Sequence, residues 1–376
     1  MSSRIGGSVH WIKTAAVGAV HPRVSARVAT LTGRTTQPSS RVRGTPHDDG
    51  SPVMIEVTLE EVRAAAERIR DRVRRTPLRE VPWPEGARAG VRLFLKLECE
   101  QVSGAFKGRG ANHFIVRLLE SAPDVSGVVT YSSGNHGRAV AEAAAAAGIA
   151  ALVVVPDHVD VSKAASIAAA GAEVVRAGPT STSRRQRAEA IATERGWTIV
   201  PPFDHPWIVA GQATATLEIL DAFPDPPVGI WAPVGGGGLA SGAAVVLREL
   251  APNATLHTAE PEGAAKFAES HRAGRRVELS QTASVADGLL PLAVGASNFE
   301  ILESARVAAH TVPESAITET FRLLRRELDI GCEPSGAVAP AAVRASLPDL
   351  EPGLHVAIVS GGNIADARLQ SLLSGT

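Results

Sequence analysis

Lysine is scarce in this chain, and the positions of the few lysines are informative. Only five of the 38 Lys and Arg residues are lysine, in a chain of 376 residues. Burial lowers the pKa of a lysine and makes it neutral and nucleophilic, whereas an arginine keeps its charge. Lys107 lies in a glycine-rich segment, Ser103-Gly-Ala-Phe-Lys-Gly-Arg-Gly-Ala111. A lysine kept there suits a Schiff base with an aldehyde cofactor, although a solvated lysine at a helix start has the same pattern.

Other shortages argue against whole classes of protein. Aromatic residues make up 4% of the chain and the formal net charge is -1, which argues against a nucleic-acid partner. No apolar run has the length of a membrane-spanning helix, because the longest one, 139–155, contains Glu142 and Gly148. The only two cysteines, Cys99 and Cys332, lack metal-site spacing and predict free thiols in a reducing cytoplasm.

The N-terminal segment, residues 1–53, lacks acidic residues before Asp48 and is rich in Arg, Ser, Thr and Gly. This composition predicts a disordered leader or a start site placed too early, and it also fits an organellar transit peptide. Directly afterwards, Thr58 and Glu61 have the spacing of a capping box. We therefore expect the folded part of the chain to begin at about Met54.

From Met54 onward, patterns typical of helices and strands alternate. Helices are expected at 58–74, 108–120, 139–147, 162–170, 183–194, 212–220 and 238–250. Strands are expected at 91–98, 127–131, 151–155, 173–175, 197–200, 229–234, 255–259 and 355–359. This alternation predicts an α/β protein with doubly wound, mostly parallel sheets. We expect two such domains, a small one at 118–205 and a larger one made of 54–117 and 206–376.

A second glycine-rich segment, Pro233-Val-Gly-Gly-Gly-Gly-Leu239, lies between a predicted strand and a predicted helix. Without Cβ atoms, successive N–H groups can point at one phosphate, and the following helix adds its dipole. The motif alone leaves the ligand open, because glycine-rich turns bind many phosphates. An aldehyde site at Lys107 together with a phosphate site indicates pyridoxal 5'-phosphate. The predicted phosphate loop consists of Gly235, Gly236, Gly237, Gly238 and Leu239.

Two further turns at strand ends contain hydroxyl and amide side chains. Tyr131-Ser-Ser-Gly-Asn-His-Gly137 opens a helix, so its N–H groups and hydroxyls could hold a substrate carboxylate. The same turn also fits an ordinary helix cap, and His136 taken alone is more easily structural than catalytic. Val359-Ser-Gly-Gly-Asn363 ends the last predicted strand, where the Ser360 hydroxyl could meet a ring nitrogen.

Together and in this order, these four motifs resemble those of the fold-type II pyridoxal-phosphate enzymes. The resemblance is strongest to the threonine/serine dehydratase and serine racemase family, and it extends from about Thr58 to Asn363. It implies that the cofactor lies in a cleft between the two domains. Further matching segments are Thr76-Pro-Leu78, Lys96-Leu-Glu98, Pro156 with Lys163, Phe203-Asp-His-Pro206, Ala210-Gly-Gln-Ala-Thr214, Glu260-Pro261, Ala286-Asp-Gly288 and Glu333-Pro-Ser-Gly336.

The resemblance also implies a role for each matching residue. Lys107 would bind the cofactor covalently and act as the base on one face. In serine racemases, the residue that matches Ser133 is the base on the opposite face. Phe106 would pack at the cofactor and Asn135 would contact its ring hydroxyl. The remaining implied contacts are Gly235 to Gly238 with the phosphate, Ser360 with the pyridine nitrogen, and Ser132, Ser133, Gly134 and His136 with the substrate carboxylate.

Three positions depart from the family pattern, and one of them is Ala213, where the family has Gly. Arg138 stands where the family commonly has Gln, and it could reach an additional acidic group or point to solvent. Racemase-like members bind a divalent cation with a Glu and an Asp six residues later, and this chain has Glu260 and Lys266 there. We therefore expect no metal, with the Lys266 ammonium either paired with Glu260 or projecting into solvent.

The Ser360 hydroxyl bears on the type of reaction. Unlike a carboxylate, it does not enforce a protonated ring, and a weaker electron sink favours prompt loss of a β-leaving group. Together with this preference for elimination, the resemblance implies a lyase that converts L-threonine or L-serine to a 2-oxo acid and ammonia. The alternatives are a serine racemase that uses Lys107 and Ser133, and an inactive phosphate-ligand-binding protein of the same fold. The expected partners are the amino-acid substrate and further copies of the chain, in a homodimer or homotetramer, and neither a membrane nor a nucleic acid.

Overall fold

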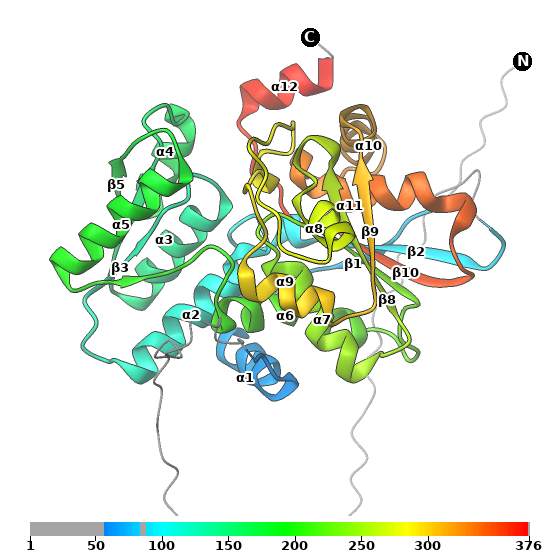
Figure 1. Ribbon diagram of the computed structural model, residues 1–376, viewed down its shortest axis with the longest axis horizontal. Coiled ribbons are helices and arrows are strands. Elements are labelled where there is room, and N and C mark those ends of the chain that lie inside the picture. Colours follow the sequence, from blue (N-terminus) through cyan, green and yellow to red (C-terminus); the bar gives the residue numbers. More distant parts are fainter. Residues whose placement is uncertain (1–55, 83–87, 375–376) are drawn as a thin grey trace, which may run out of the picture. The chain divides into compact units, whose positions relative to one another are not determined.

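The computed structural model describes residues 56–82 and 88–374, and the expected leader at 1–53 lies outside this part. Two separate sheets form its framework, one of six strands and one of four (Figure 1). This arrangement confirms the predicted α/β class.

The larger sheet has the strand order β1-β2-β10-β7-β8-β9. All neighbouring strands are parallel except β1, which pairs antiparallel with β2. Such a sheet buries its central strands on both faces, in agreement with the apolar segments around the predicted phosphate loop. The strands are β1 (Leu78–Glu80), β2 (Val91–Lys96), β7 (Gly229–Pro233), β8 (Thr255–Pro261), β9 (Val307–Val312) and β10 (Gly353–Ile358).

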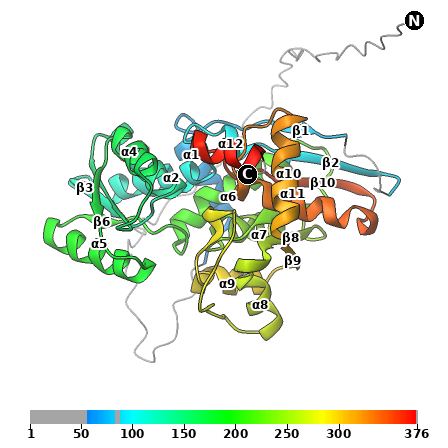
Figure 2. The ribbon, with the colours of Figure 1, turned by 90° about the horizontal axis from the view of Figure 1, so that it is seen from above.

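Helices cover both faces of the larger sheet (Figure 2). Trp231 of β7 packs into a buried cluster with residues of α10 (Glu314–Arg326) and α11 (Pro334–Ser346). Its neighbour Ile230 faces the opposite way, into a cluster with residues of α6 (Pro206–Leu220) and α7 (Gly238–Leu250). The remaining helices of this region are α1 (Leu59–Ile69), α8 (Lys266–Ala273), α9 (Ala296–Glu303) and α12 (Asp366–Ser374).

The smaller sheet contains four parallel strands in the order β5-β4-β3-β6. It lies with its helices at the left of Figure 1, and α2, α3 and α4 cover one face while α5 covers the other. Its strands are β3 (Gly127–Thr130), β4 (Ala150–Val155), β5 (Glu173–Arg176) and β6 (Thr198–Ile199). The helices are α2 (Lys107–Ser121), α3 (Asn135–Ala147), α4 (Val161–Ala169) and α5 (Ser181–Arg195).

The start of the first helix agrees with the sequence, but its end does not. The Thr58 hydroxyl accepts a hydrogen bond from the Glu61 N–H and the Glu61 carboxylate accepts one from the Thr58 N–H, so the capping box is confirmed. The helix ends at Ile69 and not at 74 as expected. The Gln101 side chain binds both the N–H and the carbonyl group of Arg74, which satisfies this backbone outside the helix.

Two helices near the strand ends begin earlier than expected. α3 begins at Asn135 and not at 139, with Gly134 as its N-cap. α6 begins at Pro206 and not at 212, because Pro occupies the first helical turn and the His205 ring accepts the Trp207 N–H. Within the described residues, no helix combines the length and the apolar character required to cross a membrane.

Candidate active site

Lys107, the first residue of α2, is only partly exposed. Its Nζ donates a hydrogen bond to the Pro202 carbonyl at 2.7 Å and lies 5.1 Å from the centre of the Phe106 ring. Burial lowers the pKa of the Lys107 amine to about 8. A useful fraction of this amine is therefore neutral near neutral pH, as attack on an aldehyde requires. The Phe106 N–H donates to the Ser360 carbonyl at 3.1 Å, which brings two of the motifs together.

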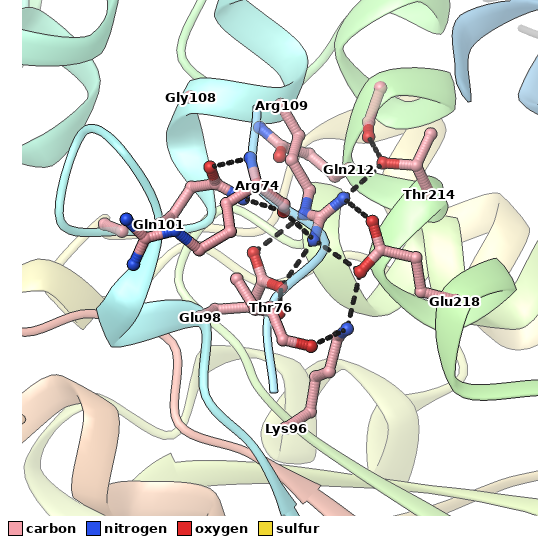
Figure 3. Close-up of polar contacts among 12 residues, drawn as sticks. Arg74, Thr76, Lys96, Glu98, Gln101, Gly108, Arg109, Gln212, Thr214 and Glu218 are labelled. Atoms are coloured by element: carbon pink, nitrogen blue, oxygen red, sulfur yellow. Dashed lines mark hydrogen bonds and ion pairs between the residues drawn. The ribbon is translucent and has the colours of Figure 1, made fainter. Parts of the chain in front are cut away.

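A cluster of buried ions lies beside α2, and its central residue, Arg109, is two positions after Lys107 (Figure 3). Arg109 is completely buried, and its guanidinium makes two hydrogen bonds to each of two carboxylates, at 2.7 to 2.9 Å. These carboxylates belong to Glu98 and Glu218, and Lys96 pairs with Glu218 at 2.5 Å. We refer to Lys96, Glu98, Arg109 and Glu218 as the Arg109 cluster.

The Arg109 cluster is balanced in charge and holds several segments together. Burial raises the pKa of the Glu98 carboxyl, but the charge and hydrogen bonds of Arg109 outweigh this effect and hold the pKa below its usual value. Glu98 follows β2 and Glu218 belongs to α6, so Arg109 fixes the first turn of α2 against both elements. No role was predicted for these residues from the sequence, although Lys96, Glu98 and Arg109 lie in segments that match the family.

The predicted phosphate loop connects β7 to α7, and it is buried except for Gly235, which is partly exposed. Gly237 has a φ of 97°, and a Cβ on Gly236 would lie 2.1 Å from the Phe203 ring, so side chains are excluded at both positions. Within the described residues, the N–H groups of Gly235, Gly236 and Gly237 have no hydrogen-bond acceptor. Free N–H groups at the start of a helix suit a phosphate. Leu239, by contrast, is buried in the core beneath this loop.

The turn after β3 places the predicted carboxylate-binding residues at the N-terminus of α3. Ser132 and Ser133 are partly exposed, and Gly134 is exposed. The Ser132 hydroxyl accepts the Gly134 N–H at 3.4 Å, whereas the Ser133 hydroxyl has no partner among the described residues. The first N–H groups of a helix and these hydroxyls provide donors for an anion.

His136 lies in the same turn but is buried. Its Nε2 is 3.2 Å from the Val200 carbonyl oxygen, which only accepts, so Nε2 carries the hydrogen and Nδ1 is left as an acceptor. Nδ1 has no partner among the described residues. Burial, together with the charge of Lys107, lowers the pKa of His136 to about 3. His136 is therefore a neutral ring that lies close to Lys107.

Ser360, Asn135 and Glu333 come together from three separate segments. The Ser360 hydroxyl is buried and donates to the Ser335 carbonyl at 3.3 Å. Asn135 Nδ2 donates to Glu333 Oε1 at 2.7 Å. Burial is the main cause that raises the pKa of the Glu333 carboxyl to about 8, and the negative charge of Asp287 adds to it. Glu333 is a further polar group of this region, to which the sequence analysis gave no role.

A group of three ionic side chains connects the smaller sheet to the larger one. Lys163 on α4 and Arg368 on α12 both contact Asp287 Oδ2, at 2.5 and 2.8 Å. Asp287 directly precedes Gly288, whose carbonyl oxygen would lie 3.2 Å from a Cβ on Gly235. This bridge therefore lies next to the predicted phosphate loop, and it contains one more cation than carboxylate.

Two of the departures from the family pattern, Lys266 and Arg138, have distinct environments. Lys266 is fully buried and its Nζ lies 2.9 Å from Glu260 Oε1, so the pairing is confirmed and the solvent-exposed alternative is wrong. Arg138 is about one-third exposed and donates to both Glu142, at 2.8 Å, and Asn363, at 3.0 Å. Within the described residues, no group of three or more His, Cys, Asp or Glu side chains has the geometry of a metal site.

Known proteins with similar sequences and structures agree with this geometry. The chain is 31% identical over 322 residues to the L-threo-3-hydroxyaspartate ammonia-lyase of Saccharomyces cerevisiae, covering 86% of this chain and 98% of the relative. It is 32% identical to the serine racemase of Schizosaccharomyces pombe over 84% of this chain and 97% of the relative. A crystal structure of a pyridoxal 5'-phosphate-dependent aspartate racemase superposes with a TM-score of 0.80 at 30% identity, over 85% of this chain and 99% of that one.

A family model provides the broader assignment. Residues 69–361 match the model described as pyridoxal-phosphate dependent enzyme. The partly neutral lysine, the phosphate loop with free N–H groups and the neutral Ser360 hydroxyl all fit the cofactor of that family. The chain therefore belongs to the pyridoxal-phosphate-dependent enzymes of fold-type II, within the branch of β-eliminating and racemising members, and its cofactor is pyridoxal 5'-phosphate.

Proposed function

We propose that this protein is an ammonia-lyase that acts on a small β-hydroxy amino acid, with L-serine and L-threonine as leading substrates. The products would be a 2-oxo acid and ammonia. When bound, pyridoxal phosphate withdraws electrons from the substrate Cα and so makes its proton removable. Relatives named as ammonia-lyases support this class of reaction.

The observation that carries the proposal is the difference between the two candidate bases. The Lys107 amine has a pKa lowered to about 8, which suits a general base near neutral pH. A serine hydroxyl becomes a useful base only when a neighbouring group takes its proton. No described residue hydrogen-bonds to the Ser133 hydroxyl. One strong base on one face supports elimination over racemisation.

Other residues of the site have roles that follow from their contacts. The free N–H groups of the phosphate loop would hold the phosphate, and the turn at Ser132 to Gly134 would hold the substrate carboxylate. Ser360 is a neutral partner for the pyridine nitrogen, which limits how long a carbanion survives and favours loss of the hydroxyl. His136, neutral and buried, would contribute a hydrogen-bond acceptor at Nδ1.

A second candidate substrate is L-threo-3-hydroxyaspartate. Lys163 and Arg368 share the single carboxylate of Asp287, which leaves one positive charge to attract a second carboxylate on the substrate. The named activity of the yeast and Pseudomonas relatives supports this candidate. A serine racemase remains the alternative reaction, supported by the relative from Schizosaccharomyces pombe.

One assay distinguishes the four possibilities: a serine or threonine lyase, a hydroxyaspartate lyase, a racemase and an inactive binding protein. The holoenzyme is incubated with L-serine, L-threonine and L-threo-3-hydroxyaspartate, and 2-oxo acid, ammonia and D-enantiomer are measured. We expect 2-oxo acid and ammonia in equal amounts from at least one substrate, with D-enantiomer as a minor product. D-Serine as the main product would contradict the lyase proposal. A bound cofactor without turnover of any of them would favour the inactive binding protein.

A further inference from the structure

The side chain of Asn363, in the segment after β10, makes contacts in three directions. Its Oδ1 accepts a hydrogen bond from Arg138 NH1 at 3.0 Å. Its Nδ2 donates to the Ser103 carbonyl at 2.9 Å and to Asn135 Oδ1 at 2.8 Å. All hydrogen-bonding directions of this amide are therefore used except one lone pair of Oδ1.

Two of these neighbours, Arg138 and the Ser103 carbonyl, allow only one orientation of the Asn363 amide. A guanidinium only donates and a backbone carbonyl only accepts. The Asn363 oxygen must therefore face Arg138 and its nitrogen must face the Ser103 carbonyl. A reversed amide would place two donors against each other at one end and two acceptors at the other. In the allowed orientation, the second Nδ2 hydrogen points to Asn135.

The orientation of the Asn363 amide determines the orientation of the Asn135 amide. Because its Oδ1 accepts from Asn363, its Nδ2 faces Glu333 and donates to Oε1 at 2.7 Å. The other Nδ2 hydrogen of Asn135 has no acceptor among the described residues. The amide thus offers a donor to a ligand and no free acceptor on that side. The reversed amide would present its oxygen to the Glu333 carboxylate and repel it whenever that carboxyl is ionised.

We propose that Asn363 is a positioning residue for the cofactor. Arg138 and the Ser103 carbonyl hold Asn363. In this position Asn363 keeps Asn135 with an N–H directed at the oxygen of the ring hydroxyl of pyridoxal phosphate. The proposal rests on the family cofactor and on the placement of Asn135 at that oxygen. It does not depend on which amino acid is the substrate. It also gives a role to Arg138, since a Gln at that position could donate or accept and would leave the direction open.

A double-mutant cycle tests the proposal without any amino-acid substrate. The four proteins are the full-length wild-type holoenzyme, Asn363→Ala, Asn135→Ala and the double variant. The measurement is the rate at which each holoenzyme releases its cofactor to an excess of an unrelated apoenzyme that binds pyridoxal phosphate. We expect Asn363→Ala to accelerate release by about three- to tenfold. This is the effect expected from losing the one hydrogen bond between Asn135 and the cofactor. In the Asn135→Ala background the same change should have almost no effect.

The outcomes separate positioning from general damage to the fold. Equal acceleration in both backgrounds would mean that Asn363 acts independently of Asn135, and no acceleration in the wild-type background would mean that it does not act on the cofactor; either result overturns the proposal. If Asn363→Ala does not fold, Arg138→Met replaces it in the same cycle, with a smaller expected acceleration because the Ser103 carbonyl still orients Asn363.

A matched control uses the other partner of Arg138. Glu142→Gln removes the ion pair with Arg138 but leaves the contacts of Asn363 intact. Its release rate should equal that of the wild type, and its melting temperature should change little, because the pair is partly exposed. If Glu142→Gln accelerates release as much as Arg138→Met does, the effect comes from the ion pair. That result would overturn the role proposed for the hydrogen-bonded amides of Asn363 and Asn135.

Discussion

At the scale of single residues, the site is marked by polar groups that lack the partners found elsewhere in the molecule. Lys96, Lys163 and Lys266 each pair with a carboxylate, and among the described lysines Lys107 alone does not. A buried ammonium without a counter-ion is costly, so the amine of Lys107 is readily neutral. The scarcity of lysine in the sequence and the isolation of Lys107 in the structure thus support the same chemistry.

The first prediction concerns covalent attachment of the cofactor. Borohydride reduction of the wild-type holoenzyme followed by peptide mapping should place the label on Lys107. Lys107→Ala should show no label and should lose elimination activity by at least about a hundredfold, because the general base is also removed. Label on Lys96, Lys163 or Lys266 in the wild type would contradict the assignment of the site.

The second prediction concerns Glu333 and pH. Burial raises the pKa of its carboxyl to about 8, so between its usual value and pH 8 the folded protein holds a proton that the unfolded chain releases. The stability contributed by this proton is complete at low pH and is lost as pH rises towards 8, by about 1.4 kcal/mol per pH unit. The melting temperature of the wild type should therefore fall relative to that of Glu333→Gln as the pH is raised from 6 to 8.5. Parallel curves for the two proteins would contradict it, and Glu319→Gln, an exposed position, is the control.

The third prediction concerns the buried pair of Lys266 and Glu260. Lys266 also donates to the carbonyl groups of Val234, Ala264 and Leu289. Lys266→Ala should lower the free energy of unfolding by about 3 kcal/mol or more, because it leaves Glu260 buried without its counter-ion. Wild-type activity should be unchanged by EDTA and by added Mg²⁺ or Ca²⁺, since an ammonium already occupies this place. Strong activation by Mg²⁺ would show the prediction to be wrong.

At the scale of elements, the position of Lys107 depends on how closely α2 approaches α6. A Cβ on Gly211 would lie 2.6 Å from the Gly110 Cα and 2.9 Å from the Arg109 carbonyl oxygen. The Arg109 cluster connects the same two helices through Glu218. Lys107 is three residues before Gly110, and Pro202, which accepts its hydrogen bond, lies shortly before α6. The helix crossing therefore sets the distance between the amine and this carbonyl.

The fourth prediction tests this crossing. Gly211→Ala should force α2 and α6 apart, because the new methyl group meets backbone atoms that cannot rotate away. We expect a loss of about 1 to 3 kcal/mol in the free energy of unfolding, with slower cofactor attachment. Gly331→Ala is the matched control, since a Cβ there meets nothing within 4 Å. Equal effects of the two substitutions would contradict the importance of the crossing.

The sequence predicted some elements of the site well and others poorly, for physical reasons. α7 was expected at 238–250 and β7 at 229–234, close to their observed bounds, because glycines interrupt strong apolar patterns there. α11 was not predicted, since it is buried all round and has no amphipathic period. The Arg109 cluster could not be predicted either, because Arg109 and Glu218 are 109 positions apart and only the packing of α2 on α6 brings them together.

At the scale of the whole described molecule, the candidate site draws on both sheets, and side chains of α3 and α4 make polar contacts there with the region of the larger sheet. Lys163 belongs to a helix of the smaller sheet, whereas Asp287 and Arg368 belong to the region of the larger sheet. All three side chains are 30% to 39% exposed, so water screens the pairs and they add little to stability. Under the proposed function, their charge would remain available to a second carboxylate of the substrate.

The last prediction uses this bridge to distinguish the candidate substrates. Lys163→Met should leave the melting temperature nearly unchanged, because exposed ion pairs contribute only about 0 to 1 kcal/mol. It removes one of the two cations at Asp287, so KM for L-threo-3-hydroxyaspartate should rise by about tenfold, while KM for L-serine should change far less. Arg195→Gln, which breaks a comparable ion pair with Glu173 within the smaller sheet, should alter neither value. An equal rise in both KM values would mean that Lys163 affects the binding of both substrates alike and does not recognise a second carboxylate.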